Sequence, residues 1–413
     1  MRFLRPTALS RMLMLWAFFC AGVSGAGEIE IKLDALVDNG GYVITKNGRA
    51  IAQLNKNRLF IPASTIKIAT SLMALEVLGP SHRINTEFYL RNDKILCIKG
   101  YGDPYLLSER VQEIAAGLRQ RGLSQVESLI LDNSFFALKE PVDGAENSAN
   151  PYDAENMALA VNFNSVALIK YQTGIVDSPE PQTPVLNIAK DIGALIDPGL
   201  HRVNVSAYQR RDARITAQRY TAELFAEQLR RQGIAVGTGY RSGKVAAGDA
   251  LLYTYRSKMT VAEMISGCLK YSNNYIANQL FLLCGAARFG PPATWKKAQQ
   301  AMAETLSSAA GLSSRDIIVV EGSGLSRKNL ATPAAMITLL VRFKPHAELL
   351  SKTGNTPLKS GTMTGVYGYA GYFDQTGALD PFVILLNQES NTRDQLLTLA
   401  SALHHQAKQT PAQ

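Results

Sequence analysis

A serine and a lysine stand three residues apart in the segment Phe60–Lys67, which reads FIPASTIK. The apolar run after them, with Gly79 at its end, predicts a helix, and Pro62 suits the position just before it. Residues three apart on a helix are neighbours, so we expect Ser64 and Lys67 to touch. A serine hydroxyl needs a base to become a nucleophile, and a lysine amine can serve when burial lowers its pKa. The apolar neighbours of Lys67 favour such burial.

Ser-x-x-Lys is common by chance, and alone it would indicate that Ser64 caps the helix and Lys67 is solvated. A second segment favours a catalytic interpretation. Ser272 and Asn274 fall where one predicted helix gives way to another, which would place both side chains at the rim of a cleft. A serine there can pass a proton between the lysine amine and a leaving nitrogen, and an asparagine can hold a substrate amide. Taken alone, this tripeptide would indicate only a helix cap.

The third segment is Lys359-Ser360-Gly361-Thr362, which precedes a strand rich in aromatic residues and glycine. A second cation near Lys67 would help to keep that amine neutral. A lysine beside a hydroxyl also forms a pair that binds a carboxylate. We expect Gly361 to let substrate backbone approach closely. A similar triplet, Lys352-Thr353-Gly354, is followed by a turn and is interpreted as loop.

The N-terminus predicts export. Three arginines precede an apolar run over 12–23, and small residues follow at 24–26. This is the pattern of a secretory signal peptide over 1–26, and it is too short for a convincing membrane span. The C-terminal segment 391–413 lacks the basic face of a helix that lies on a membrane surface. We therefore expect an exported, periplasmic, soluble protein without a stable membrane anchor.

Composition excludes some partners. The 413 residues are 46% hydrophobic and 19% charged, which is typical of a globular protein with two or three cores. The net charge of +9 falls to +6 without the signal peptide, because that segment holds three arginines and no acid. The remaining charge is spread along the chain, which favours a solvated surface over nucleic-acid binding.

No metal or cofactor is expected. The cysteines of the mature chain, Cys97, Cys268 and Cys284, lie in apolar contexts without metal-ligand spacing, so they are predicted to be buried free thiols. The five histidines are scattered, which counts against a Ser-His-Asp mechanism.

Around these segments the pattern predicts a mixed α/β protein. An Asn-Gly turn joins two antiparallel strands at 41–45 and 50–54, directly before the Ser64 helix. Thr260 and Glu263 form a capping box that opens a helix ending near 271. The other predicted strands are 87–90, 95–98, 128–132, 159–164, 166–169, 367–373 and 382–387, and the other predicted helices are 108–121, 220–232, 275–283, one after Pro333, and 393–405.

In this order the three segments form a signature of penicillin-binding proteins and serine β-lactamases. Nearly the whole mature chain resembles the class C low-molecular-mass penicillin-binding proteins, the D-alanyl-D-alanine carboxypeptidase/endopeptidase family. The further phrases that carry the resemblance are Gly102-Asp103-Pro104, Val161-Asn162-Phe163-Asn164, Gly322-Ser323-Gly324-Leu325-Ser326-Arg327, Thr364-Gly365-Val366 and Ala370-Gly371-Tyr372. The chain departs from the family in Ser360, where threonine is usual, and in a short loop before Lys359.

The resemblance implies the domain organisation. A transpeptidase/β-lactamase-like domain, with an antiparallel sheet covered by helices and a helical lobe, is expected to comprise 27–84 and 256–413. Ser272 follows Ser64 by 208 positions, which is too many for one compact helical lobe, so an accessory domain is expected at 85–255.

The resemblance also implies the activity. A serine carboxypeptidase of this kind cleaves the terminal D-Ala-D-Ala bond of peptidoglycan stem peptides, some members also cut cross-links, and β-lactams acylate the same serine. The resemblance assigns the nucleophile to Ser64, the general base to Lys67 and the proton relay to Ser272. It assigns the orientation of the lysine and of the substrate amide to Asn274. Lys359 and Ser360 would bind the carboxylate, and the N–H groups of Ser64 and Thr362 would form the oxyanion hole. Asp132 and Arg327 match charged positions of the family's pocket for the stem side chain; a strand-end cap and a loop salt bridge are the alternatives.

Two other functions stay open. A β-lactamase needs a group that activates a deacylating water, and no candidate carboxylate is evident. A non-catalytic penicillin- or peptidoglycan-binding protein is the second alternative, against which the complete set of motif residues argues. The sequence leaves open the exo or endo preference, the stem-peptide chemistry, the turnover and the oligomeric state.

Overall fold

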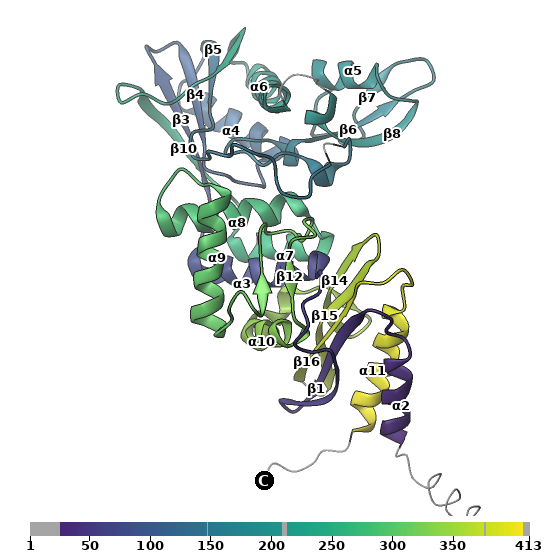
Figure 1. The fold of residues 1–413 in the computed structure, drawn as a ribbon. Coiled ribbons are helices and arrows are strands. Elements are labelled where there is room, and N and C mark those ends of the chain that lie inside the picture. Colours follow the sequence, from purple (N-terminus) through teal and green to yellow (C-terminus); the bar gives the residue numbers. More distant parts are fainter. Residues whose placement is uncertain (1–24, 147, 209–212, 376, 408–413) are drawn as a thin grey trace, which may run out of the picture.

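A computed structural model describes residues 25–146, 148–208, 213–375 and 377–407 (Figure 1). Residues 1–24 of the predicted signal peptide lie outside the described residues. Within the described part, no helix has the length and apolar character needed to cross a bilayer. The fold is mixed α/β, as predicted, with antiparallel sheets and a helical lobe.

The largest sheet has six strands, and all of its neighbouring strands are antiparallel. Their order is β13 (Lys352–Thr353), β14 (Thr356–Met363), β15 (Val366–Gln375), β16 (Ala378–Leu386), β1 (Gly40–Lys46) and β2 (Arg49–Leu54). The predicted hairpin of β1 and β2 is confirmed, and its turn residues Asn47 and Gly48 both have positive φ. Such a turn matches the twist of the two strands.

Both faces of this sheet are covered, which explains the continuous apolar run of β16. Phe382 and Ile384 pack in one core with α2 (Gly25–Asp34) and α11 (Arg393–Gln406), which lie side by side in Figure 1. Val383 and Leu385 face the opposite way, into the core that contains α10 (Pro333–Phe343).

The helical lobe is built around α3 (Lys67–Val77), the helix predicted after Ser64. Nine of its eleven residues are buried, because α7 (Val261–Tyr271), α8 (Asn274–Phe289), α9 (Trp295–Ala310) and α10 all pack against it. The capping box at Thr260 and Glu263 is confirmed. Cys97, Cys268 and Cys284 are buried free thiols, also as predicted.

Residues between the first two motifs form separate sheets, in the upper part of Figure 1. One sheet has the order β10 (Ala250–Arg256), β3 (Asn85–Arg91), β4 (Ile95–Gly100), β5 (Gln125–Asp132) and β9 (Ala235–Ser242), and α4 (Ser108–Gln120) and α6 (Ala213–Arg231) pack against it. The other sheet comprises β7 (Val176–Asp177), β6 (Ser165–Lys170) and β8 (Gly199–Asn204), with α5 (Asn187–Gly193) beside it. The domain boundaries at 84/85 and 255/256 remain predictions.

Two predicted elements are wrong. Leu159 to Asn164 is not a strand, since Asn162, Phe163 and Asn164 all adopt left-handed backbone within the short helix η3 (Asn162–Asn164). Lys352 and Thr353 are not loop but form β13, because the Gly354 turn folds them back onto β14. In both cases the local composition resembles the wrong element, and tertiary contacts decide the outcome.

Candidate active site

Ser64 lies in the short helix η1 (Ala63–Ile66), one turn before α3 begins at Lys67. The predicted contact exists, with Lys67 Nζ 2.8 Å from Ser64 Oγ. Ser64 is partly exposed, whereas Lys67 is fully buried. The serine hydroxyl therefore faces the outside of the lobe while its neighbouring amine is shielded from water.

The Lys67 amine has two further partners. Its Nζ lies 2.8 Å from Asn274 Oδ1 and 2.6 Å from the carbonyl oxygen of Ser323. Both are acceptors, so a neutral amine uses its two hydrogens on them. Its lone pair then faces the Ser64 hydroxyl, which is the only one of the three partners that can donate a proton to it.

Burial makes the neutral form accessible. It lowers the pKa of Lys67 to about 8, against the opposing influence of the Cys268 thiol and the Glu321 carboxylate. Lys359 is also buried, and burial followed by repulsion from Lys67 lowers its pKa to about 7. Because the Lys67 charge is among the causes of the low Lys359 pKa, protonation of one amine is linked to protonation of the other.

A substrate carboxylate changes how this pair holds its protons. An anion beside Lys359 stabilises the Lys359 ammonium. When Lys359 stays charged, its repulsion disfavours protonation of Lys67. Binding of an anionic substrate end thus leaves Lys67 as the neutral base.

Ser272 and Asn274 flank the break between α7 and α8, as predicted. Ser272 ends α7 in a left-handed conformation, with φ of 53°, and Asn273 caps α8 by accepting from the Ile276 N–H. This reversal lets α8 begin at Asn274, whose side chain reaches Lys67. A non-glycine residue in left-handed backbone is strained, and such strain clusters at functional sites.

The third segment lies on β14, which packs directly against η1. A Cβ at Gly361 would stand 2.7 Å from the Pro62 carbonyl oxygen and 3.2 Å from the Ala63 Cβ. Glycine is therefore required here for contact with the Ser64 turn. The expected approach of substrate backbone to Gly361 stays a prediction.

Lys359 and Ser360 come next to each other on β14, and Lys359 donates from Nζ to the Ser360 carbonyl over 2.7 Å. Thr362 is exposed. Its hydroxyl accepts from Arg393 Nη1 over 2.6 Å, and the same nitrogen donates to the Gly361 carbonyl over 2.9 Å. Sequence reasoning missed Arg393, because no local pattern links the start of α11 to β14.

Sequence reasoning also missed Glu321, a fully buried carboxylate at the start of the GSGLSR loop. It accepts hydrogen bonds from the backbone N–H groups of Ser323, Gly324 and Ser326, from the Ser323 hydroxyl, and from the amides of Asn278 and Asn329. These bonds fix the loop whose Ser323 carbonyl meets Lys67. Gly324 lets the loop reach η1, because a Cβ there would stand 2.0 Å from the Ala63 carbonyl oxygen.

The structure does not bring Asp132 and Arg327 together. Asp132 is buried at the end of β5, where it accepts from the N–H groups of Ser134 and Val245, each over 2.8 Å. This is the arrangement of a strand-end cap. Arg327 is exposed and donates to the Thr364 carbonyl over 2.6 Å, in the turn after β14. Among the described residues, no hydrogen bond or ion pair joins Asp132 or Arg327 to Ser64, Lys67 or Lys359. Their role in a side-chain pocket stays a prediction.

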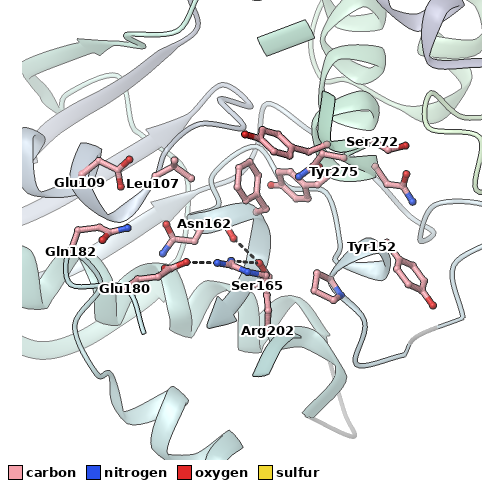
Figure 2. Close-up of a pocket in the computed structure, with 15 residues that line it drawn as sticks. Leu107, Glu109, Tyr152, Asn162, Ser165, Glu180, Gln182, Arg202, Ser272 and Tyr275 are labelled. Carbon is pink, nitrogen blue, oxygen red and sulfur yellow. Dashed lines mark hydrogen bonds and ion pairs between the residues drawn. The ribbon is translucent and has the colours of Figure 1, made fainter. Parts of the chain in front are cut away.

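A pocket adjoins Ser272 and Asn274 on the side of the inserted residues (Figure 2). Its volume is about 530 Å³. Within the described ranges, no group of three or more His, Cys, Asp or Glu side chains is placed to hold a metal ion. The candidate site is thus a serine, two buried amines, a second serine and an amide beside an open pocket.

Comparison with known sequences gives the site a context. The sequence model of the D-Ala-D-Ala carboxypeptidase 3 (S13) family matches residues 31–190 and 206–351. The chain is 26% identical to a D-alanyl-D-alanine carboxypeptidase of Actinomadura sp. strain R39, covering 85% of this chain and 80% of that protein. It is 24% identical to D-alanyl-D-alanine carboxypeptidase DacB of Haemophilus influenzae, covering 83% of this chain and 84% of that protein.

Comparison with solved structures supports the fold. Penicillin-binding protein 4 of Haemophilus influenzae superposes with a TM-score of 0.73 at 20% identity, over 91% of this chain and 98% of that one. A predatory endopeptidase of Bdellovibrio bacteriovorus, solved with an immunity protein, gives a TM-score of 0.54 at 16% identity, over 89% and 92% of the two chains. The described residues therefore adopt a penicillin-binding-protein fold.

Proposed function

Because this chain belongs to the D-Ala-D-Ala carboxypeptidase 3 (S13) family, we propose that it is a serine D-alanyl-D-alanine carboxypeptidase acting on peptidoglycan stem peptides. The observation that carries this proposal is the position of Lys67 Nζ, 2.8 Å from both Ser64 Oγ and Asn274 Oδ1. A nucleophile, its base and the group that orients the base thus come from two segments far apart in the sequence.

Acylation begins with transfer of the Ser64 hydroxyl proton to neutral Lys67. Ser64 Oγ attacks the penultimate D-alanine carbonyl, and the N–H groups of Ser64 and Thr362 stabilise the oxyanion. The proton passes from Lys67 through the Ser272 hydroxyl to the leaving nitrogen. The C–N bond then breaks, and a free amine and an ester at Ser64 result.

Substrate is held by its terminal carboxylate. Lys359, in its charged form, and the Ser360 hydroxyl provide the binding pair. The anion also favours a neutral Lys67, so substrate binding and base activation are coupled. Water then attacks the ester, with Lys67 accepting its proton, and the shortened stem peptide is released.

β-Lactams acylate the same serine in this proposal, because they present an acyl carbonyl and a carboxylate in a similar arrangement. A structure of penicillin-binding protein 4 from Haemophilus influenzae, complexed with a β-lactam, supports this, with a TM-score of 0.68 at 20% identity. We further propose that the chain is exported to the periplasm by residues 1–26 and acts without a membrane anchor.

Mass spectrometry of the intact protein after brief exposure to penicillin tests the proposal. The expected result is one covalent penicilloyl adduct per chain, mapped by proteolysis to the peptide that contains Ser64 and absent from Ser64→Ala. D-Alanine release from a pentapeptide stem should be lost in the same variant. An adduct on another residue, or none on the wild type, contradicts the mechanism and favours a non-catalytic binding protein.

Nitrocefin turnover separates the peptidase from a β-lactamase. The peptidase is expected to give a long-lived acyl-enzyme and little turnover. Sustained turnover of many molecules per second by each enzyme molecule would instead identify a β-lactamase.

A further inference from the structure

Arg393 stands where the local structure disfavours a cation. It is the first residue of α11, the helix that lies beside the large sheet in Figure 1. The helix dipole places partial positive charge at this end, which favours acidic side chains. The preceding residue, Thr392, makes no capping bond with its side chain, and its hydroxyl donates to the Leu36 carbonyl. An arginine at this position therefore needs favourable contacts outside its own helix.

The guanidinium of Arg393 is shielded and oriented by an aromatic ring. Its central carbon lies 4.7 Å from the centroid of the Tyr369 ring, and the side chain is only 15% exposed. The Tyr369 hydroxyl donates to Asp394 Oδ1 over 2.6 Å, which fixes the ring. Among the described residues, the one ion-pair contact of Arg393 is long, with 3.9 Å between its Nε and Asp394 Oδ1. Its short polar contacts are instead with β14.

These contacts converge on one peptide group. Arg393 Nη1 donates to the Gly361 carbonyl over 2.9 Å and to Thr362 Oγ1 over 2.6 Å. The carbonyl of Gly361 and the N–H of Thr362 belong to the same peptide group. Because that group is planar and trans, its C=O and its N–H point in opposite directions. Arg393 thus binds the carbonyl end of the group whose N–H end is assigned to the oxyanion hole.

The other contacts of β14 show which way the Thr362 N–H points. Backbone groups of successive residues in a strand point to opposite edges, so those of Ser360 and Thr362 share one edge. At that edge the Ser360 carbonyl accepts from Lys359 Nζ over 2.7 Å, and the Lys359 amine is near enough to Lys67 for their charges to repel. The Thr362 N–H therefore points to the edge of the two lysines, and Arg393 approaches from the opposite edge.

A cation on the carbonyl of a peptide group strengthens the N–H of that group. A hydrogen bond to the oxygen draws electron density from the nitrogen, so the N–H becomes a better donor, and linked hydrogen bonds reinforce one another in this way. Bonds from a charged donor are the strong ones, and a guanidinium stays charged at every accessible pH. The gain at the Thr362 N–H is greatest when its acceptor becomes negatively charged.

We propose that Arg393 is a positioning residue for the oxyanion hole, which fixes the Gly361–Thr362 peptide group and strengthens the Thr362 N–H as a donor. The inference rests on the proposed acyl-transfer function, because an oxyanion must form after attack by Ser64. Arg393 itself makes no bond to the substrate. Its effect is therefore expected in the transition state and not in the initial complex.

Stopped-flow acylation by penicillin tests the proposal, because it separates the dissociation constant of the initial complex from the rate constant of acylation. Arg393→Gln removes the charge, and Arg393→Lys keeps a charge without the forked donors. The matched control is Arg91→Gln, since Arg91 is similarly shielded, with a side chain 21% exposed, and pairs with Asp249 in the inserted sheet. This control should lose stability but acylate like the wild type.

Arg393→Gln should acylate about tenfold more slowly, because loss of a whole oxyanion-hole donor costs about 100- to 1,000-fold and here the donor is only weakened. The dissociation constant of its initial complex should stay within about twofold of wild type. Infrared spectra give a second readout. The ester carbonyl of the acyl-enzyme should absorb at higher wavenumber in Arg393→Gln, because its hydrogen bond is weaker. Arg393→Lys should fall between the wild type and Arg393→Gln in both measurements.

The pH profile gives a third readout that a purely structural role would not move. The Arg393 charge is among the influences that lower the Lys359 pKa. The fall in activity at high pH should therefore move to higher pH in Arg393→Gln and stay in place in Arg393→Lys.

Three results would overturn the positioning role and leave the carboxypeptidase intact: an unchanged acylation rate and carbonyl frequency in Arg393→Gln, a loss confined to the dissociation constant, or an equal slowing in Arg91→Gln. If Arg393→Gln does not fold, Arg393→Lys decides, and acylation at the wild-type rate with an unshifted carbonyl band overturns the role. A wild type that forms no penicillin adduct would overturn the acyl-transfer function itself.

Discussion

The carbonyl oxygen of Ser323 lies 2.6 Å from Lys67 Nζ, and the Ser64 hydroxyl contacts the same nitrogen. The carbonyl can only accept, whereas the hydroxyl can give up its proton. The Ser323 carbonyl and the Asn274 side chain together therefore fix the direction of the lone pair on a neutral Lys67. The base is oriented by two acceptors before any substrate arrives.

The first prediction concerns pH. Acylation needs Lys67 neutral and Lys359 charged, which means one proton on the coupled pair. Their pKa values are about 8 and about 7, both lowered by burial, so the free enzyme keeps a single proton mostly on Lys67, and the substrate carboxylate moves it to Lys359. Below about 7 both amines are protonated and the base is lost; above about 8 both are neutral and the carboxylate loses its cation. The expected kcat/KM profile is bell-shaped with its maximum between these values, measured as D-alanine release.

A variant separates the two limbs of that profile. Lys359→Arg keeps a charge at all accessible pH values, so the fall above pH 8 should disappear while the rise at lower pH stays. The level of activity is expected to drop, because the guanidinium does not reproduce the amine's geometry. A wild-type profile that is flat from pH 6 to pH 10 would contradict the paired-lysine argument.

The second prediction concerns Glu321. Glu321→Gln places an amide among six donors, so at least one buried donor loses its acceptor. The expected cost is about 2–4 kcal/mol of unfolding free energy. Loss of the Glu321 charge also removes an interaction that raises the Lys67 pKa, so the acidic limb of the pH profile should move to lower pH.

Glu348→Gln is the matched control, because Glu348 is exposed in the short helix η5 (Lys344–Leu349). Its unfolding free energy should stay within about 0.5 kcal/mol of wild type. Urea unfolding and the pH dependence of penicillin acylation measure the two effects. A Glu321→Gln protein that is destabilised but keeps an unshifted pH profile would mean that Glu321 acts on the fold alone.

The third prediction concerns the contact between β14 and η1. Gly361→Ala places a methyl group 2.7 Å from the Pro62 carbonyl oxygen, so β14 and the Ser64 turn must separate. The expected cost is about 1–3 kcal/mol in stability. Because displacement of reacting groups by about 1 Å can cost about 100-fold in rate, penicillin acylation should slow by between tenfold and 100-fold.

Gly248→Ala provides the comparison. No atom lies within 4 Å of a Cβ at Gly248, and its backbone does not need a positive φ. Stopped-flow acylation of this variant should match wild type. If Gly361→Ala acylates at the wild-type rate, the close packing of β14 on η1 is not what places the third segment.

The contact and the helix break in the proposed catalytic segments could be predicted from sequence because the signals for them are local. Ser64 and Lys67 share one turn, and the α7–α8 break at Ser272 follows from the capping signals around it. The apolar periodicity of α3 and the Asn-Gly turn of β1 and β2 likewise specify their elements directly. Each of these predictions depends on residues only a few positions apart.

The rest of the site depends on contacts that no short pattern contains. Arg393 meets Gly361 from the start of α11, and Glu321 acts through six donors from three segments. The close approach of Gly361 to Pro62 also joins two segments far apart in the sequence. The left-handed run at Asn162–Asn164 has an alternating composition typical of a strand, but the hydrogen bonds to Ser108 and Tyr220 impose another backbone.

The fourth prediction concerns Asp132, whose two possible roles give different results. Its carboxylate accepts from the N–H groups of Ser134 and Val245, which ties the end of β5 to the segment after β9. Asp132→Ala leaves both donors without that acceptor, at an expected cost of about 3 kcal/mol in unfolding free energy. Asp132→Asn keeps one acceptor oxygen and should lose about half as much.

If Asp132 is a cap, the loss of activity follows the loss of folded protein. At a temperature where Asp132→Asn remains folded, kcat/KM should then change by the same factor on stem peptides with a diaminopimelate and with an uncharged residue at the third position. If Asp132 instead contacts the stem side chain, the variant loses activity on the diaminopimelate stem selectively, by about tenfold or more. Because Asp132 is buried and both its oxygens are bonded to backbone, we expect the uniform change.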